Sequence, residues 1–364
     1  MRDFIPQIEP WIDNSELKEL KRVIDSTFIT ENKLTKEFED MIKELTGSKY
    51  AIAITNGTAA LFCCLKALDI GPGDEVIVPN MTFVATSNAV LMAGAKPILC
   101  EIDPDTLCLD PSNLQELISP NTKAIIPVHL YGQSCDMERI CEIAQENNIK
   151  IVEDAAQGVG VTFNNKHVGT FGDLGILSFY GNKTITCGEG GIILTDSKHL
   201  RDLCYRLKNH GRIKKGTFKH DYIGFNFSFT EMQAAIGISQ MKKLPLIVDR
   251  KKKIHDRYYT ELSKISDKLC PIFLDQRTNP VWWFTSFLTE NKESLQEYLL
   301  KMGIQTRDFF YPLHKQPCYD KMCFEGDFSI SERVYNQGIS LPSSYGLSER
   351  EQDYIIDCIY KFYG

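Results

Sequence analysis

Four short segments hold residue types from which a cofactor-dependent active site could be built: TNGTAA (55–60), EDAAQ (153–157), SFYGNK (178–183) and GEGG (188–191). Asp154 closes the apolar run KIVED, at the kind of strand end where α/β sheets place ligands. Because a buried carboxylate needs a cationic partner, Asp154 would face one. Taken by itself, the residue is better explained as the cap of a following helix.

Lys183 follows the apolar run GILSFY after only Gly-Asn. A lysine held near buried surface has a lowered pKa, which favours imine formation with a carbonyl group. Exposed loop lysines are far commoner. The position of Lys183 within SFYGNKTITCGEGG is therefore what distinguishes it from the other lysines.

The turn TNG (55–57) precedes a helix that is predicted to begin near Ala59, and we expect this turn to bind an anion. Gly57 and Thr58 can present backbone N–H groups at that helix terminus, where aligned amides bind phosphate. Ser178 would add a hydroxyl group. Most Gly-Thr turns are only turns, so this signal is weak without its neighbours.

These segments lie in a chain that alternates short apolar runs with helical stretches, a pattern that predicts an α/β fold with a parallel or mixed sheet. A helix is predicted over 230–244. The charged stretch 248–265 predicts a second, long and exposed helix.

We place a domain boundary near Leu244. It divides the chain into a large cofactor domain, 1–244, and a smaller C-terminal α/β domain, 245–364. In the smaller domain, NPVWWFTSFLT (279–289) predicts a strand and KESLQEYLLKMG (292–303) an amphipathic helix.

The chain of 364 residues is acidic, with a formal charge of −7 and a pI of about 5.6. This argues against a general nucleic-acid binder, which needs a basic face. Neither a signal peptide nor a membrane span is predicted, so we expect a cytoplasmic protein without a membrane partner. Its 12 cysteines lack paired metal-ligand spacing and predict free thiols, several of them inside apolar stretches, rather than a metal site: Cys63, Cys64, Cys100 and Cys141.

The order of the four segments resembles fold-type-I pyridoxal-phosphate enzymes, and specifically the nucleotide-sugar aminotransferases of the DegT/StrS family. The resemblance covers essentially the whole chain. It implies pyridoxal 5'-phosphate as cofactor, with pyridoxamine phosphate as its second form, a large cofactor domain and a smaller C-terminal domain. It also implies that Lys183 is the Schiff-base lysine and that Asp154 holds the pyridine nitrogen.

The same resemblance assigns further contacts. Gln157 would meet the ring hydroxyl, and Phe83 would stack on the ring, although a core phenylalanine is the competing explanation. Asn226 matches an asparagine that reaches the cofactor phosphate from the neighbouring subunit, which implies a homodimer with shared active sites.

A basic segment, KNHGRIKKGTFKH (208–220), precedes Asn226 in this acidic chain. A solvated loop is one explanation. The other is a substrate pocket between subunits, because the diphosphate of a nucleotide sugar needs cationic donors. The candidate donors are His210, Arg212 and Lys215, and His314 matches a family pattern near the sugar, although a structural histidine is as good an explanation.

Some relatives carry histidine in place of the lysine and are sugar dehydratases, so Lys183 favours amino transfer. The resemblance implies transfer from an amino acid, L-glutamate, to C4 of a nucleotide-linked 4-keto-6-deoxyhexose. Gly-Asn before the lysine resembles the branch that contains GDP-perosamine synthase, with UDP- or dTDP-linked sugars as alternatives. Three alternative functions are compatible with the sequence. They are a 3-aminotransferase, an enzyme acting on amino acids that binds their carboxylate through Arg307, and a non-catalytic regulator.

Overall fold

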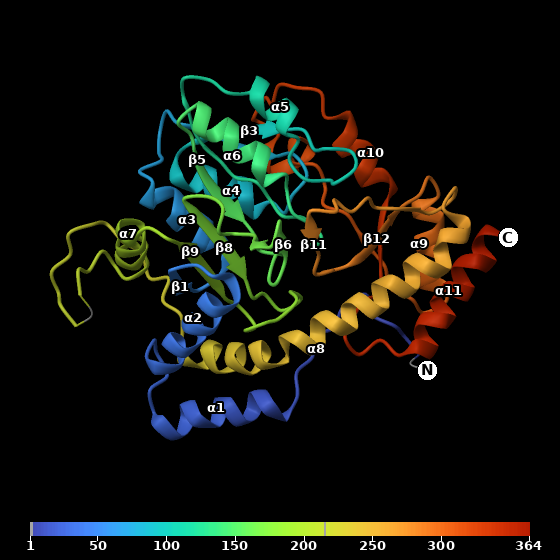
Figure 1. Ribbon diagram of the computed structural model, residues 1–364, viewed down its shortest axis with the longest axis horizontal. Helices are drawn as coiled ribbons and strands as arrows, with labels where there is room; N and C mark the ends of the chain where they lie inside the picture. The colour runs from blue at the N-terminus through green and yellow to red at the C-terminus, as the bar shows by residue number, and fades with distance from the viewer. Residues whose placement is uncertain (1–2, 215) are drawn as a thin grey trace.

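Helices pack on both faces of a large mixed sheet, and a smaller sheet with its own helices lies beside it in the computed structural model (Figure 1). The structure describes residues 3–214 and 216–364. The helices are α1 Asn14–Ser26, α2 Lys33–Thr46, α3 Gly57–Ala67, α4 Ala85–Ala93, α5 Pro111–Glu116, α6 Met137–Glu146, α7 Lys198–Lys208, α8 Glu231–Leu262, α9 Lys292–Lys301, α10 Ser329–Gln337 and α11 Glu349–Tyr363.

Over the described residues, seven strands form the large sheet in the order β1-β9-β8-β5-β4-β2-β3. The strands from β8 to β3 run parallel to one another, whereas β9 is antiparallel to both of its neighbours. The bounds are β1 Tyr50–Ile54, β2 Glu75–Pro79, β3 Lys96–Cys100, β4 Thr122–Ile125, β5 Lys150–Asp154, β8 Leu174–Ser178 and β9 Gly191–Thr195. The predicted α/β class is confirmed, and the sheet is mixed.

Both faces of this sheet are buried, which explains why its strands are continuous apolar runs. In β2, Val76 and Val78 point into a core shared with α3 and α4. Ile77 points to the opposite face, where α5 and α6 cover it. Strand side chains alternate between faces, so a run of consecutive valines and isoleucines feeds both cores at once.

The parallel pairing brings two predicted site residues to one edge of the sheet. Strand β5 ends at Asp154, which pairs with Ile176 of β8, and β8 ends at Ser178. Parallel strands present their carboxyl ends at the same edge, where ligands bind in open α/β sheets.

A smaller, antiparallel sheet lies near the C-terminus, in the order β10-β12-β14-β13, and a short third sheet is ordered β11-β6-β7. The predicted strand at 279–289 is shorter than expected, since β12 covers only Thr285–Leu288, while the predicted helix at 292–303 is α9. The remaining bounds are β6 Thr162–Phe163, β7 Lys166–His167, β10 Cys270–Pro271, β11 Thr278–Asn279, β13 Arg307–Asp308 and β14 Gly338–Leu341.

Helix α8 connects the two large structural units and runs unbroken past Leu244, with Pro245 inside it (Figure 1). Thr230 begins the helix through a capping box with Gln233. The first part of the helix packs on the core of the large sheet and the last part on that of the smaller sheet. The division into 1–244 and 245–364 stays a prediction.

The prediction of an exposed helix over 248–265 is wrong for one of its faces. Lys251, Ile254, His255 and Tyr258 are buried there. This face is hard to recognise in such a charged sequence. It has only about one apolar residue per turn, and a lysine and a histidine fill the rest of it.

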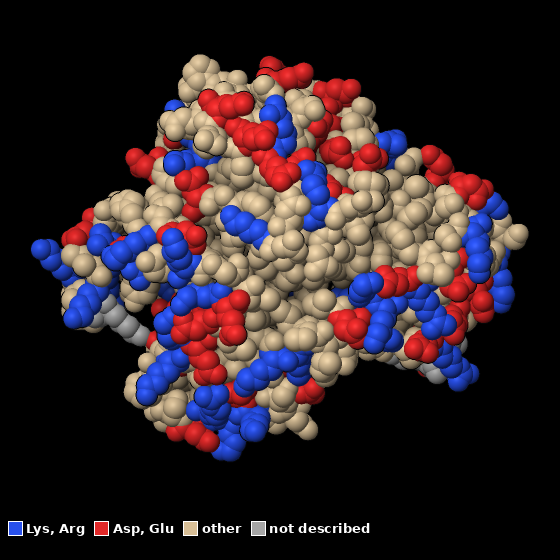
Figure 2. All heavy atoms as spheres, in the orientation of Figure 1, with Lys and Arg blue, Asp and Glu red and all other residues tan. Residues whose placement is uncertain are grey.

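A long loop between α7 and α8 projects from the body of the molecule, at the left of Figure 1. Two isolated bridges, Asn209 to Asn226 and Arg212 to His220, give it the form of a hairpin. Two apolar side chains near the outer end of this loop face solvent: Phe218 is 89% exposed and Ile223 90%. Figure 2 shows lysine and arginine side chains gathered at its outer end.

Candidate active site

A cavity of about 540 Å³ opens at the carboxyl edge of the large sheet. Seven of the residues predicted to bind a cofactor line it: Gly57, Thr58, Phe83, Asp154, Gln157, Ser178 and Lys183. Their segments are far apart in sequence. They meet here because strands β5 and β8 end, and helix α3 begins, at the same edge of the sheet. A pocket of this size and mixed polarity is typical of small-molecule sites.

Lys183 reaches the cavity from the turn after β8, where its backbone N–H donates to the carbonyl of Tyr180 at 2.9 Å. Its amine Nζ lies 4.1 Å from the ring centroid of Trp283. Burial lowers the pKa of Lys183 to about 8, an effect that the carboxylate of Asp154 opposes and the guanidinium of Arg307 reinforces. An amine with this pKa is partly neutral near neutral pH and can act as a nucleophile.

Asp154 is 5% exposed and accepts hydrogen bonds from two groups of the chain. The hydroxyl of Thr86 donates to Oδ2 at 2.8 Å, and the backbone N–H of Ala156 donates to Oδ1 at 3.1 Å. Burial raises the pKa of this carboxyl group, which both hydrogen bonds oppose. A carboxylate so placed is stabilised by a cationic N–H group entering the cavity.

Gln157 is oriented by a backbone contact. Its Oε1 accepts a hydrogen bond from the N–H of Tyr131 at 2.7 Å. With the acceptor occupied, the Nε2 group is left as the donor, and Gln157 lines the cavity. This suits a ligand oxygen that accepts hydrogen bonds.

The first turn of α3 also lines the cavity. Asn56 caps the helix by accepting from the N–H of Ala59 at 2.8 Å, which leaves the first N–H groups of the helix for a ligand. A Cβ atom added to Gly57 would lie 3.2 Å from Cβ of Ser178, and one added to Gly191 would lie 2.7 Å from the carbonyl oxygen of Asn56. Glycine at both positions lets β8, β9 and the turn close into an anion-binding cradle.

Phe83 is not part of the core. Its side chain is 57% exposed at the cavity, and its ring centroid lies 6.1 Å from that of Phe310. The competing explanation as a core phenylalanine is therefore wrong. An exposed ring beside a polar cavity offers a flat face for a planar ligand.

Four of the remaining predicted residues are described by the structure and do not line this cavity. Asn226, His210 and Arg212 lie on the projecting loop, whereas Lys215 falls outside the described residues. Both ring nitrogens of His314 are occupied, by Asn80 at 3.1 Å and Glu332 at 3.0 Å.

Lys208, the first residue of the basic segment, is buried and is not available to a ligand. Its Nζ pairs with Glu31 at 2.8 Å and donates to the carbonyl of Ala53 at 2.7 Å. Among the cysteines named above, Cys141 is partly exposed and the other three are buried.

Sequence reasoning missed Thr86, Trp283 and Phe310, and gave Arg307 only an alternative role. Thr86 and Phe310 stand near predicted site residues, but nothing in their surroundings marks them. The adjacent tryptophans in VWWF were a usable signal, because a buried tryptophan needs a hydrogen-bond partner for its indole N–H.

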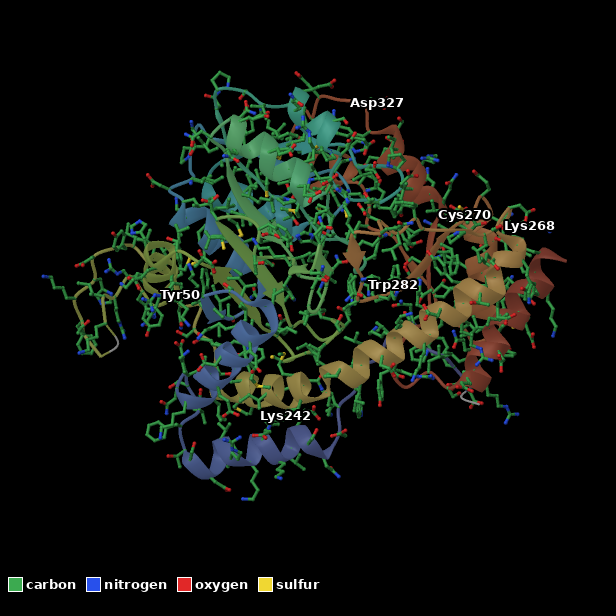
Figure 3. The ribbon with its side chains drawn as sticks, viewed as in Figure 1. Tyr50, Lys242, Lys268, Cys270, Trp282 and Asp327 are labelled. Carbon is green, nitrogen blue, oxygen red and sulfur yellow. The ribbon has the colours of Figure 1, made fainter. Side chains whose placement is uncertain are left out.

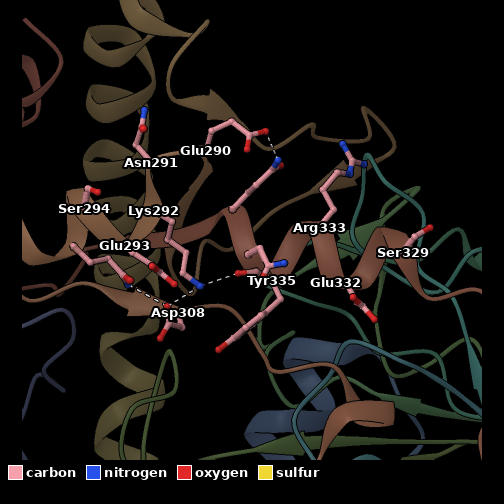
Figure 4. A pocket seen from close by; sticks show the side chains of 13 residues that line it. Glu290, Asn291, Lys292, Glu293, Ser294, Asp308, Ser329, Glu332, Arg333 and Tyr335 are labelled. Carbon is pink, nitrogen blue, oxygen red and sulfur yellow. Dashed lines mark hydrogen bonds and ion pairs between the residues drawn. The ribbon is translucent and has the colours of Figure 1, made fainter.

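A second hollow, of about 720 Å³, lies between α9 and α10 (Figure 4). Its buried cation is already neutralised: Nζ of Lys292 lies 3.0 Å from Oδ1 of Asp308 and donates to the carbonyl of Tyr335 at 2.8 Å. None of the four predicted segments lines this hollow. Over residues 3–214 and 216–364, we find no cluster of acidic, histidine or cysteine side chains suited to a metal and no helix that could cross a membrane.

Residues 10–360 match the model of the DegT/DnrJ/EryC1/StrS aminotransferase family. The chain belongs to this family. It is 35% identical to the GDP-perosamine synthase of Vibrio cholerae and 37% identical to that of Escherichia coli O157:H7, over 99% of each chain. A crystal structure of a DegT DnrJ EryC1 StrS aminotransferase from Brucella abortus superposes with a TM-score of 0.92 at 32% identity, over 96% of both chains.

Membership in the DegT/DnrJ/EryC1/StrS family makes this chain a sugar aminotransferase of the pyridoxal-phosphate-dependent class. The predicted family and fold are confirmed. The cavity fits the cofactor of that class on its own geometry. A buried carboxylate, an amine of lowered pKa, an exposed ring and a cradle of glycines and helix amides are the four features such a cofactor needs.

Proposed function

We propose that this enzyme binds pyridoxal 5'-phosphate through Lys183 and transfers an amino group from L-glutamate to C4 of a nucleotide-linked 4-keto-6-deoxyhexose. The observation that carries the proposal is the presence of Lys183 and Asp154 in one cavity, with the pKa of the amine lowered to about 8 by burial. A histidine in place of the lysine would be unable to form an imine.

Each residue has a distinct part in this chemistry. Bound pyridoxal phosphate supplies an electron sink for carbanion chemistry. Asp154 would hold the ring N–H, Gln157 would donate to the ring oxygen, and the amides of Gly57 and Thr58 with the hydroxyl of Ser178 would hold the phosphate. Lys183 would form the covalent link and then move a proton to or from the reacting carbon.

The sugar is proposed from the relatives. Two GDP-perosamine synthases match over 99% of their length, which supports a GDP-linked substrate. UDP- or dTDP-linked sugars and amination at C3 are the alternatives, because discrimination between bases depends on hydrogen bonds outside the cofactor cavity. The product would serve the assembly of surface polysaccharides.

We propose further that the enzyme is a homodimer with shared active sites. Phe218 and Ile223 are almost fully exposed on the projecting loop, and such side chains favour burial against a partner. Asn226 closes this loop and lies outside the cavity of its own chain, as a residue that serves the neighbouring site would. The free thiols of Cys63, Cys64 and other cysteines suit a reducing compartment, and we propose the cytoplasm.

The decisive experiment incubates the purified enzyme with L-glutamate and, separately, GDP-, UDP- and dTDP-linked 4-keto-6-deoxyglucose or 4-keto-6-deoxymannose. We expect one nucleotide sugar to acquire an amino group, and NMR should locate that group at C4. Amination at C3 would overturn the regiochemistry. Reaction confined to pairs of amino acids and keto acids would overturn the substrate class and favour the use of Arg307 as a carboxylate ligand.

A further inference from the structure

Trp283 connects the loop of Lys183 to helix α8. Its indole Nε1 donates a hydrogen bond to the carbonyl oxygen of Asn182 at 2.6 Å. The centroid of the same ring lies 4.1 Å from Nζ of Lys183. One side chain therefore holds both the backbone that precedes the lysine and the reactive end of the lysine itself.

We propose that Trp283 is a positioning residue for Lys183 and that Lys251 of α8 holds Trp283 in place. The role of Trp283 in turnover rests on the proposed function, whereas its effect on the amine of Lys183 does not depend on that function. Trp283 forms no bond to substrate in this proposal, and it acts only through the lysine.

The two contacts act on different properties of Lys183. The hydrogen bond to Asn182 fixes the turn and hence the origin of the lysine side chain. The ring face attracts the charged ammonium form more than the neutral amine. It therefore opposes the effect of burial, which lowers the pKa of Lys183 to about 8.

The indole itself cannot shift easily. It is 2% exposed and stacks on Phe284 with centroids 3.9 Å apart and planes 23° apart. The backbone before it lies close to Gly132, where an added Cβ atom would stand 2.1 Å from the carbonyl oxygen of Val281. The stacked ring and the confined backbone before it together keep the indole in a fixed orientation toward Lys183.

Lys251 anchors the backbone of Trp283 from the other side. Its Nζ donates to the carbonyl oxygen of Trp283 at 3.0 Å and to that of Ser343 at 3.2 Å. The side chain is 3% exposed, and no carboxylate of the described residues pairs with it. A buried amine without an acid is costly, so its two carbonyl contacts are what keeps it in this position.

The neighbouring tryptophan is held by the same helix. The ring of Trp282, labelled in Figure 3, stacks on His255 of α8 with centroids 3.6 Å apart and planes 10° apart. Trp282 does not line the cavity, and the ring that Lys183 meets is that of Trp283. Trp282 is therefore a matched control: an adjacent, buried tryptophan that packs against the same helix but lacks the proposed role.

Positioning matters because Lys183 has two tasks in the proposed function. It must leave its covalent link and then return as the base at the reacting carbon. A free lysine side chain samples many rotamers. The face of Trp283 gives the released amine one resting place within reach of the cavity.

The test compares Trp283→Leu, Trp283→Phe and Trp282→Leu. In the cofactor-free enzyme, the rate at which trinitrobenzenesulfonate labels Lys183, followed by peptide mapping across pH, gives the pKa of its amine. We expect Trp283→Leu to lower this pKa by about 0.5 to 1 unit. Trp282→Leu should leave it unchanged while lowering the melting temperature, which separates a local effect from general destabilisation.

Trp283→Phe keeps an aromatic face but loses the donor to Asn182. We expect kcat to fall about 10-fold, with KM for both substrates within about threefold of the parent value. An unchanged or raised pKa of Lys183 in Trp283→Leu would contradict the proposed effect of the ring on the amine. An unchanged kcat in Trp283→Phe would contradict the proposed effect of the hydrogen bond to Asn182. If the parent enzyme aminates no keto-sugar, the proposed function fails, and the labelling measurement still decides the role of Trp283 toward Lys183.

Discussion

The hydroxyl of Thr86 donates a 2.8 Å hydrogen bond to Oδ2 of Asp154, the last residue of β5. Both residues are buried, and burial raises the pKa of Asp154. The hydrogen bond opposes that rise, because it favours the charged carboxylate. Thr86 thus favours the ionised form of Asp154, which suits the ring cation that we propose this carboxylate holds.

Replacing Thr86 by valine should raise the pKa of Asp154 further. A hydrogen bond to a charged group contributes about 1.5–3 kcal/mol, equivalent to about one to two pKa units. The acidic limb of the pH–kcat profile should therefore shift to higher pH. Thr86→Ser retains the hydroxyl group and should keep the parent profile; a valine variant with the parent acidic limb would contradict this role.

Reduction of the cofactor-loaded enzyme with borohydride should leave the cofactor attached to Lys183, because its amine is the one of lowered pKa in the cavity. Peptide mapping identifies the modified lysine. Lys183→Ala should remain folded but show no turnover. Modification of a different lysine would contradict the assignment.

Gly191→Ala should damage the phosphate cradle. The new Cβ atom would stand 2.7 Å from the carbonyl oxygen of Asn56, so strand β9 and the turn must move apart. We expect a loss of about 1–3 kcal/mol in unfolding free energy and weaker cofactor binding, measured by denaturation and absorbance titration. Gly181→Ala is the control from the same region, since its Cβ atom would approach no atom closer than 4.0 Å.

Lys251→Met should change how stability depends on pH. Burial lowers the pKa of Lys251 to about 7, so between that value and its ordinary pKa the unfolded chain binds more protons than the folded one. The parent protein should therefore gain stability as pH rises from about 7 to 10, by at most about 1.4 kcal/mol per pH unit from this group.

The methionine variant lacks this contribution, and urea unfolding at several pH values would reveal the difference between the two slopes. Lys252→Met is the matched control, because Lys252 pairs with Asp256 at the surface. Equal slopes in the parent protein and Lys251→Met would contradict the lowered pKa.

Mixed dimers test the shared active site. Lys183→Ala and Asn226→Asp subunits should each be inactive alone. A mixed dimer would regain one site with both native residues, so we expect up to about a quarter of the parent activity per mixture if exchange is random. An absence of recovered activity, with subunit exchange verified, would place Asn226 in the site of its own chain or in none.

The sequence alone was sufficient for the α/β class, the family and most of the predicted residues that line the cavity at the carboxyl edge of the large sheet. Asp154, Ser178 and Lys183 were assigned through the resemblance of EDAAQ and SFYGNK to the segments of the family. The apolar runs before them indicated only that these segments follow strands, whose ends meet at one edge of a parallel sheet. Gly57 and Thr58 were predicted from the chemistry of a helix start, a signal that gains weight only beside the other segments. These are short-range signals, which depend on neighbouring residues and on a topology that the family shares.

The tertiary structure alone decided which distant groups tune those residues. Trp283 lies a hundred positions from Lys183 and meets it because α8 holds the tryptophan pair against the large sheet. The burial of Lys251 is invisible in a charged stretch, since exposure depends on which helix face the smaller sheet covers. Such contacts arise from packing between separate cores, and no local pattern specifies them.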